Sequence, residues 1–89
     1  MTDVTPAVTI TVRYFAAARE AAGVDSSALT LKTGATVDDA IEELCGQSDK
    51  MILVLQKCSF LCDGVAVRDR TTVLRPHQTL DVLPPFSGG

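Results

Sequence analysis

The stretch TVDDAIEELCG, residues 36–46, decides how the rest of this chain can fold. Thr36 can cap a helix, and Asp39 three residues later completes the pattern of a capping box. Apolar side chains then recur at helical spacing and form one stripe: Val37, Ala40, Ile41, Leu44 and Cys45. Gly46 is a typical stop signal. The stretch therefore predicts one amphipathic helix with a single apolar side to bury.

The other side of this helix is acidic and consists of Asp38, Asp39, Glu42 and Glu43. Paired carboxylates can do acid-base chemistry, but a solvated helix face is far commoner. No base, metal ligand or nucleophile accompanies these residues. We interpret them as the water-facing side of the helix.

The residues before this helix predict a strand, a short helix and a second strand. In the first strand, apolar residues alternate with polar ones: Val8, Ile10, Val12 and Tyr14. Residues 16–22 are rich in helix formers, and Gly23 can end that helix. Residues 28–32 resume the alternation, so we expect two strands joined by a short helical link.

The residues after the helix predict three more strands. Residues 58–62 and 65–67 form two of them, joined by a tight turn at Asp63-Gly64. The last strand spans residues 79–83. We expect Leu80 and Val82 to point inward from it, and Thr79, Asp81 and Leu83 to point outward.

Two segments fit neither pattern clearly. Residues 47–57 can be either a further helical turn or a loop, and residues 71–78 are interpreted as a connection. His77 in that connection could act as a general base, but no Ser or Cys nucleophile accompanies it. We interpret His77 as an exposed turn residue.

This order of elements predicts an α+β fold, a small mixed sheet packed on one main helix. The last strand would return beside the first, run parallel to it and end at the same edge. Phe15 and Leu83 are each an apolar residue on an otherwise polar side, and we expect them to lie close together there. Such a pair is typical of a docking surface, but a partly covered core edge fits the pattern equally well.

The composition predicts a single domain, residues 1–89, with a loose N-terminus over residues 1–6. Of the 89 residues, 46% are hydrophobic and 21% are charged, which is far from the composition of a disordered protein. The net charge of −3 argues against nucleic acid or an anionic membrane as the main partner. We expect neither a secretory signal nor a membrane span, because the longest apolar run covers only residues 51–55.

The three cysteines, Cys45, Cys58 and Cys62, cannot all pair within one chain. We interpret them as reduced, buried thiols of a cytoplasmic protein. The spacing of Cys58 and Cys62 is neither a redox nor a zinc motif, and the single histidine lies elsewhere. We therefore predict no metal site.

The sequence ends with LPPFSGG, residues 83–89. Two successive prolines cannot continue a helix or donate to a sheet ladder, and they keep the backbone extended. Gly88 and Gly89 carry no side chain and could enter a narrow site. A frayed terminus would also tolerate these residues. A substrate tail uses both features, so we favour an extended reactive tail over residues 84–89.

Several of these motifs resemble the small subunit of molybdopterin synthase, the MoaD type of sulfur carrier. The segments VRYFA, residues 12–16, and AREAAG, residues 18–23, are similar to the opening of that family. Thr36-Val37 and the ending LPPFSGG match it as well, and the resemblance covers nearly the whole chain from Val8. It implies the β-grasp, ubiquitin-like fold.

The resemblance also implies which residues are functional. Phe15 and Leu83 fall where the family packs against the large catalytic subunit, the MoaE type. The partner-binding residues that we expect are Phe15, Leu83, Pro84, Pro85, Phe86 and Ser87. The reactive end is Gly89, with Gly88 before it.

The chemistry that the resemblance implies begins at the Gly89 carboxylate, which is ionised at neutral pH and is a poor electrophile. An adenylating enzyme that resembles ubiquitin-activating enzymes, the MoeB type, would use ATP to form an acyl-adenylate. A persulfide on another protein would then supply sulfur, leaving a thiocarboxylate that donates sulfur to a pterin precursor. The chain itself would be a non-catalytic subunit with no permanently bound cofactor.

Three alternatives stay open at this point. The same fold and tail serve sulfur carriers for thiazole or cysteine synthesis, which the Tyr14-Phe15 and Pro84-Pro85 signatures make less favoured. The tail could form an isopeptide with lysines, as in a ubiquitin-like modifier. The chain could also be a binding module in which Gly88-Gly89 has no chemical role.

Overall fold

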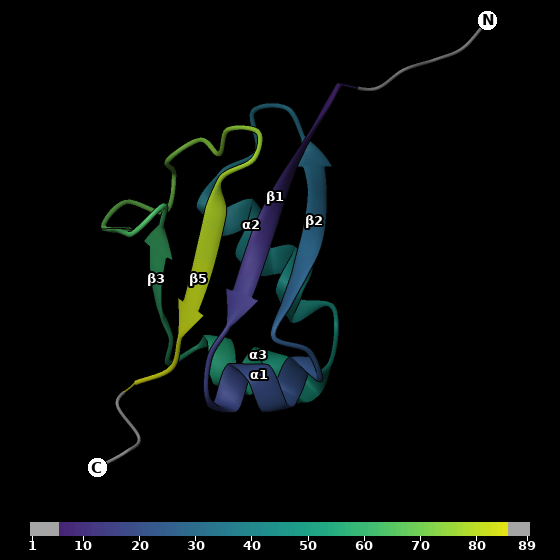
Figure 1. Ribbon diagram of the computed structural model, residues 1–89, viewed down its shortest axis with the longest axis vertical. Coiled ribbons are helices and arrows are strands. Elements are labelled where there is room, and N and C mark those ends of the chain that lie inside the picture. Colours follow the sequence, from purple (N-terminus) through teal and green to yellow (C-terminus); the bar gives the residue numbers. More distant parts are fainter. Residues whose placement is uncertain (1–5, 86–89) are drawn as a thin grey trace, which may run out of the picture.

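The structure is a computed structural model, and it describes residues 6–85 of the chain. Its elements in chain order are β1 (Ala7–Tyr14), α1 (Ala17–Ala22), β2 (Ser26–Lys32), α2 (Val37–Cys45), α3 (Asp49–Leu55), β3 (Ser59–Cys62), β4 (Val65–Ala66) and β5 (Thr79–Leu83). The strands form one sheet in the order β2-β1-β5-β3-β4 (Figure 1). β5 runs parallel to β1, and the other pairs are antiparallel. The predicted α+β architecture is therefore confirmed.

Helix α2 lies behind the sheet in Figure 1 and begins at the predicted capping box. The Asp39 amide donates to Thr36 Oγ1 at 3.2 Å, and the Thr36 amide donates to Asp39 Oδ2 at 2.9 Å. Four residues of the predicted apolar stripe are buried: Val37, Ala40, Ile41 and Leu44. Cys45 is only half-buried, because it lies in the last turn of the helix.

The core between α2 and the sheet comes from the inward side of the strands. Along β1 every second residue is buried, as the alternation predicts. The inward residues of the two neighbouring central strands are almost fully enclosed: Val8, Ile10, Val12, Tyr14, Leu80 and Val82. Tyr14 Oη is 2.9 Å from Ser27 Oγ, so the one polar atom of this side chain has a partner.

The ambiguous segment 47–57 contains the helix α3, which Ser48 caps by accepting from the Met51 amide at 3.0 Å. Met51 and Leu55 are buried, while Leu53 remains exposed. Helix α3 packs against α1 at the end of the sheet where β1 and β5 finish (Figure 1). Of the two possibilities left by the sequence, the helical one is correct.

Several boundaries and turns differ from the sequence predictions or refine them. Strand β2 begins at Ser26 instead of residue 28, and β3 begins at Ser59 instead of residue 58. The first helix begins at Ala17, since Ala16 has φ 48° and ψ −124°, outside the helical region. The Asp63-Gly64 turn is confirmed, with φ of 49° and 83° at the two residues, as a primed hairpin turn requires. Strand β4 stops at Ala66 instead of residue 67.

The connection over residues 71–78 runs back to the start of β5. It is anchored by the fully buried Leu74 and by a bridge between Thr36 and Val73. His77 is exposed and has φ 67°, so its interpretation as an exposed turn residue is confirmed. No helix in the described part of the chain is long and apolar enough to cross a membrane.

Candidate docking and transfer site

The structure brings together two of the predicted site residues, Phe15 and Leu83, at one end of the sheet. β1 and β5 pair in parallel with Tyr14 opposite Val82, so the next residues along, Phe15 and Leu83, are also neighbours. The Phe15 amide donates to the Val82 carbonyl at 3.3 Å and extends this register by one residue. The Phe15 side chain is 39% exposed, and Leu83 is half-buried.

Both side chains lie on the outer side of the sheet, opposite α2. Their neighbours along each strand, Tyr14 and Val82, point into the core and are buried. Since successive side chains on a strand alternate, Phe15 and Leu83 face away from α2. The β3 residue opposite Asp81 is Leu61, which is half-buried and adds a third apolar side chain to this side. We call Phe15, Leu61 and Leu83 the docking patch.

A strained turn holds Phe15 at the edge of the patch. The Phe15 carbonyl accepts from the Ala18 amide at 3.0 Å, which closes a turn with Ala16 at its second position. The angles of Ala16, φ 48° and ψ −124°, are those of a type II′ turn, where glycine is preferred. Non-glycine residues in such regions are costly, and they cluster at functional sites.

The chain leaves the sheet next to this patch. Strand β5 ends at Leu83, and Pro84 and Pro85 follow without regular secondary structure, as predicted. Pro84 is half-buried and Pro85 is exposed. The remaining tail residues named from the sequence, Phe86, Ser87, Gly88 and Gly89, lie outside the described residues.

Two charged residues that the sequence reasoning did not single out lie beside the patch. Arg13 Nε donates to Asp81 Oδ1 at 2.6 Å, and Arg13 Nη2 donates to Asp81 Oδ2 at 2.9 Å, a bidentate pair. The hydrogen bonds and the charge of Asp81 raise the pKa of Arg13. The Arg13 guanidinium carbon also lies 5.5 Å from the centroid of the Phe15 ring.

Asp81 differs from its sequence prediction. It lies on the outer side, as expected, yet it is only 5% exposed. Its strand is central in the sheet, with Arg13 directly opposite on one side and Leu61 on the other. The Arg13 side chain bonds to both of its carboxylate oxygens, which shields them from water.

The remaining chemistry of the described residues is limited. Cys45, Cys58 and Cys62 are free thiols, but only Cys58 is buried, and the prediction that all three are buried is wrong for the half-buried Cys45 and Cys62. Burial raises the pKa of Cys58 and of Cys62, which keeps both protonated at neutral pH. Within residues 6–85, no group of three His, Cys, Asp or Glu side chains could hold a metal ion. The docking patch therefore offers contact area and one fixed cation but no acid-base machinery.

Comparison with known proteins now adds to this geometry. Residues 12–89 match the ThiS family. The chain belongs to the ThiS family. A Chlamydomonas reinhardtii protein named molybdopterin synthase sulfur carrier subunit is 31% identical over 81 residues, 90% of this chain and 98% of the relative. An Arabidopsis thaliana protein of the same name is 30% identical over 87 residues, 98% of this chain and 90% of the relative.

Solved structures with a similar fold support the predicted architecture. The Haloferax volcanii HVO 2177 protein has a TM-score of 0.85 and 25% identity, over 100% of this chain and 93% of that protein. Small archaeal modifier protein 1 from Haloferax volcanii has a TM-score of 0.79 and 25% identity, over 91% of this chain and 99% of that protein. A ubiquitin-like protein from Trypanosoma brucei, at 9% identity, shares the fold alone, with a TM-score of 0.68. The predicted β-grasp, ubiquitin-like fold is confirmed.

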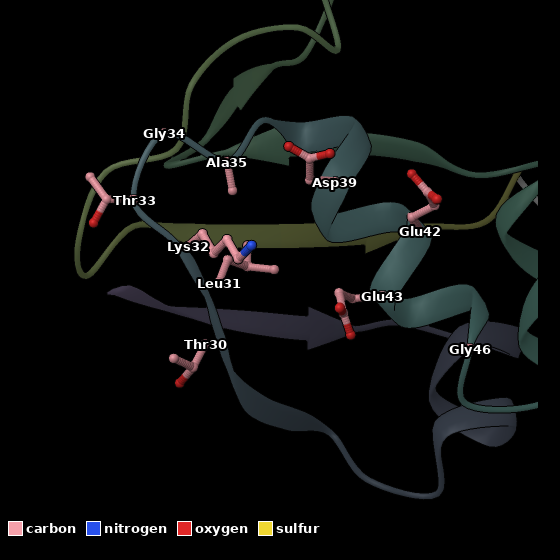
Figure 2. A pocket seen from close by; sticks show the side chains of 10 residues that line it. All are labelled: Thr30, Leu31, Lys32, Thr33, Gly34, Ala35, Asp39, Glu42, Glu43 and Gly46. Carbon is pink, nitrogen blue, oxygen red and sulfur yellow. The ribbon is translucent and has the colours of Figure 1, made fainter. Parts of the chain in front are cut away.

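This ThiS-family chain also has a groove of about 650 Å³ between β2 and α2, away from the docking patch (Figure 2). Its lining includes Lys32 and, on α2, Asp39, Glu42 and Glu43. Lys32 pairs with Ala7 at the start of β1, whereas Phe15 follows the end of that strand. The groove begins at the end of the sheet away from the tail and follows α2 as far as Gly46, on the opposite side of the sheet from the docking patch. Its carboxylates belong to the helix side that the sequence predicts to face water.

Proposed function

We propose that this chain is the sulfur-carrier subunit of a molybdopterin synthase. The observation that carries the proposal is the ThiS-family match, which extends through Gly89 and agrees with about 30% identity to two molybdopterin synthase sulfur carrier subunits. The geometry supports it, because β5 directs the chain out of the sheet beside an exposed apolar patch. The patch docks the chain on the large, MoaE-type subunit, and the tail reaches the reaction centre there.

Gly89 supplies the reactive carboxylate. A MoeB-type adenylating enzyme joins it to AMP from ATP with release of pyrophosphate, because the free carboxylate is a poor electrophile. Sulfur from a protein persulfide then displaces AMP, and a thiol cleaves the resulting sulfur–sulfur bond to leave a thiocarboxylate. The thiocarboxylate transfers its sulfur to the pterin precursor in the large subunit. Gly88 keeps the backbone before it narrow enough to enter both sites.

This role requires no permanently bound cofactor or metal on the chain, and ATP is used only by the activating enzyme. Nucleic acid and membrane are not partners in it. We place the protein in the cytoplasm, where its three thiols stay reduced.

Truncation and extension of the tail test this proposal. Deletion of Gly89, or addition of one residue after it, is expected to abolish adenylation-dependent sulfur loading, measured by intact mass after incubation with the activating enzyme, ATP and a persulfide donor. The melting temperature is expected to stay within about 2 °C, because the change removes little buried area. Loading that continues after the deletion would exclude the terminal carboxylate as the reactive group.

A second candidate is a protein modifier, and the likeness to small archaeal modifier protein 1 favours it. The same acyl-adenylate would then react with lysine amines and form isopeptide bonds. Immunoblots of cells that express a tagged chain separate the two functions. A modifier gives a ladder of lysine-linked adducts, whereas a carrier gives the free chain alone.

A further inference from the structure

The Arg13–Asp81 pair lies on the outer side of the sheet, at the boundary between apolar and polar residues. Phe15, Leu61 and Leu83 lie on one side of the pair, and Ser26, Thr11 and Thr79 lie on the others. Arg13 contacts the Phe15 ring, while Asp81 lies between Arg13 and Leu61 and precedes Leu83 by two residues. The Asp81 side chain is 7% exposed and the Arg13 side chain is 53% exposed. A buried carboxylate and a half-exposed cation thus lie at the edge of the docking patch.

Folding stability gives little reason for such a pair. The Arg13 side chain is half-exposed, so water screens the pair, and such ion pairs contribute little to the free energy of unfolding. An apolar residue at position 81 would also be typical for a central strand. The pair is better explained by its effect on the surface, where it holds the Arg13 guanidinium in place.

The pair places a cation with free donors. A guanidinium carries five N–H groups. Two of them bond to Asp81, and the other three make no hydrogen bond to any residue between 6 and 85. The bidentate bond to Asp81 and the contact with the Phe15 ring hold the Arg13 guanidinium in one orientation. The guanidinium therefore loses little further conformational freedom on binding.

We propose that Asp81 is a positioning residue that fixes Arg13 as the specificity-determining cation of the docking patch, where Arg13 binds an acidic side chain of the large subunit. The inference rests on the proposed function and adds the chemistry of the partner surface: an apolar depression for Phe15 and Leu83 with a carboxylate beside it. The chemistry of Arg13 supports this partner, because a carboxylate can accept hydrogen bonds from the guanidinium N–H groups that Asp81 leaves free.

Arg70 provides a matched control on the same chain. Its guanidinium carbon lies 5.2 Å from the Phe60 ring centroid, and its Nη1 is 4.0 Å from Asp38 Oδ1. Phe60 pairs with Val82 and is buried on the α2 side of the sheet, so Arg70 lies away from the docking patch. Arg13→Met and Arg70→Met therefore remove the same charge, each from beside a phenyl ring and a carboxylate, on opposite sides of the sheet.

The test is calorimetric titration of the purified large subunit with the full-length chain and its variants, at low and at high salt. Arg13→Met is expected to weaken binding about tenfold or more and to reduce the salt dependence, whereas Arg70→Met binds like wild type. Arg13→Lys keeps the charge but loses the fork, so it is expected to recover only part of the affinity.

Asp81→Asn separates positioning from bulk charge. It makes the chain less acidic, so long-range attraction alone would strengthen binding to an acidic partner. Positioning predicts weaker binding, by about threefold to tenfold, because Arg13 is no longer held. A thermal melt of each variant shows whether it is folded at the titration temperature. If Asp81→Asn is unfolded there, the binding of Arg13→Met alone tests the inference.

The inference is overturned if Arg13→Met binds as Arg70→Met does, or if folded Asp81→Asn binds more tightly than wild type. Its failure is distinct from failure of the proposed function. If the wild-type chain neither accepts sulfur at Gly89 nor binds the large subunit, the function itself is wrong. If both occur and only the Arg13 effect is missing, the patch docks through its apolar residues alone.

Discussion

At the ends of β1 and β5, adjacent residues on each strand face opposite sides of the sheet and have different roles. Tyr14 and Val82 point toward α2 and are 3% and 0% exposed. Phe15 and Leu83, the next residues along, face the other way and remain partly open to water. The same few residues of chain thus contribute to the core on one side and to a docking patch on the other. Apolar composition alone cannot distinguish these roles, whereas strand alternation and register can.

The largest effect is expected on the inner side. Val82→Ser should lower the free energy of unfolding by about 2–5 kcal/mol, because it leaves a cavity in the core and buries a hydroxyl group. Denaturant titration of the purified variant measures this change. A loss below about 1 kcal/mol would mean that the inner side is not the core that the burial of Val82 indicates.

On the outer side, substitutions should affect binding to the large subunit more than folding stability. Phe15→Ser or Leu83→Ser is expected to weaken association with the large subunit by about 1–4 kcal/mol, as truncation of an apolar interface anchor does. Stability should fall much less than in Val82→Ser, since both side chains are partly exposed in the free chain. Titration calorimetry and thermal melts on the same preparations measure both quantities. If these variants melt as early as Val82→Ser, Phe15 and Leu83 belong to the core, and the patch hypothesis fails.

The smallest effect concerns the turn that separates the two sides. Ala16→Gly should stabilise the fold by about 1 kcal/mol, because relief of backbone strain, about 1–3 kcal/mol, exceeds the entropy that glycine adds to the unfolded chain. Ala21→Gly, within the helix α1, is the matched control and should destabilise by about 1 kcal/mol. Denaturant unfolding measures both, and equal destabilisation by the two glycines would show that Ala16 is not strained.

Local patterns predicted much of the fold. The alternation of β1, the capping box of α2 and the Asp63-Gly64 turn each depend on residues close in sequence, and each is confirmed. The sequence does not decide between a helix and a loop over residues 47–57, because the apolar run over residues 51–55 has no clear period. The helical form of α3 depends on the Ser48 cap and on packing against α1.

The site was predictable only in part, because some of its contacts join residues that are far apart in the sequence. The parallel return of the last strand was enough to bring Phe15 and Leu83 together. The burial of Asp81 was not predictable, because it depends on Arg13, 68 residues earlier in the chain. Only the exact register of β1 against β5 places these two residues opposite one another. The ion pair beside the docking patch could therefore be found only in the structure.

The central claim is that Gly89 carries sulfur, and intact mass spectrometry of the chain purified from its own cells tests it most directly. We expect a fraction of chains whose mass is raised by the replacement of one oxygen by one sulfur, with fragmentation placing the change at Gly89. That fraction should disappear from cells that lack the adenylating enzyme. A chain found only with an unmodified carboxylate, or only linked to lysines of other proteins, would contradict the claim.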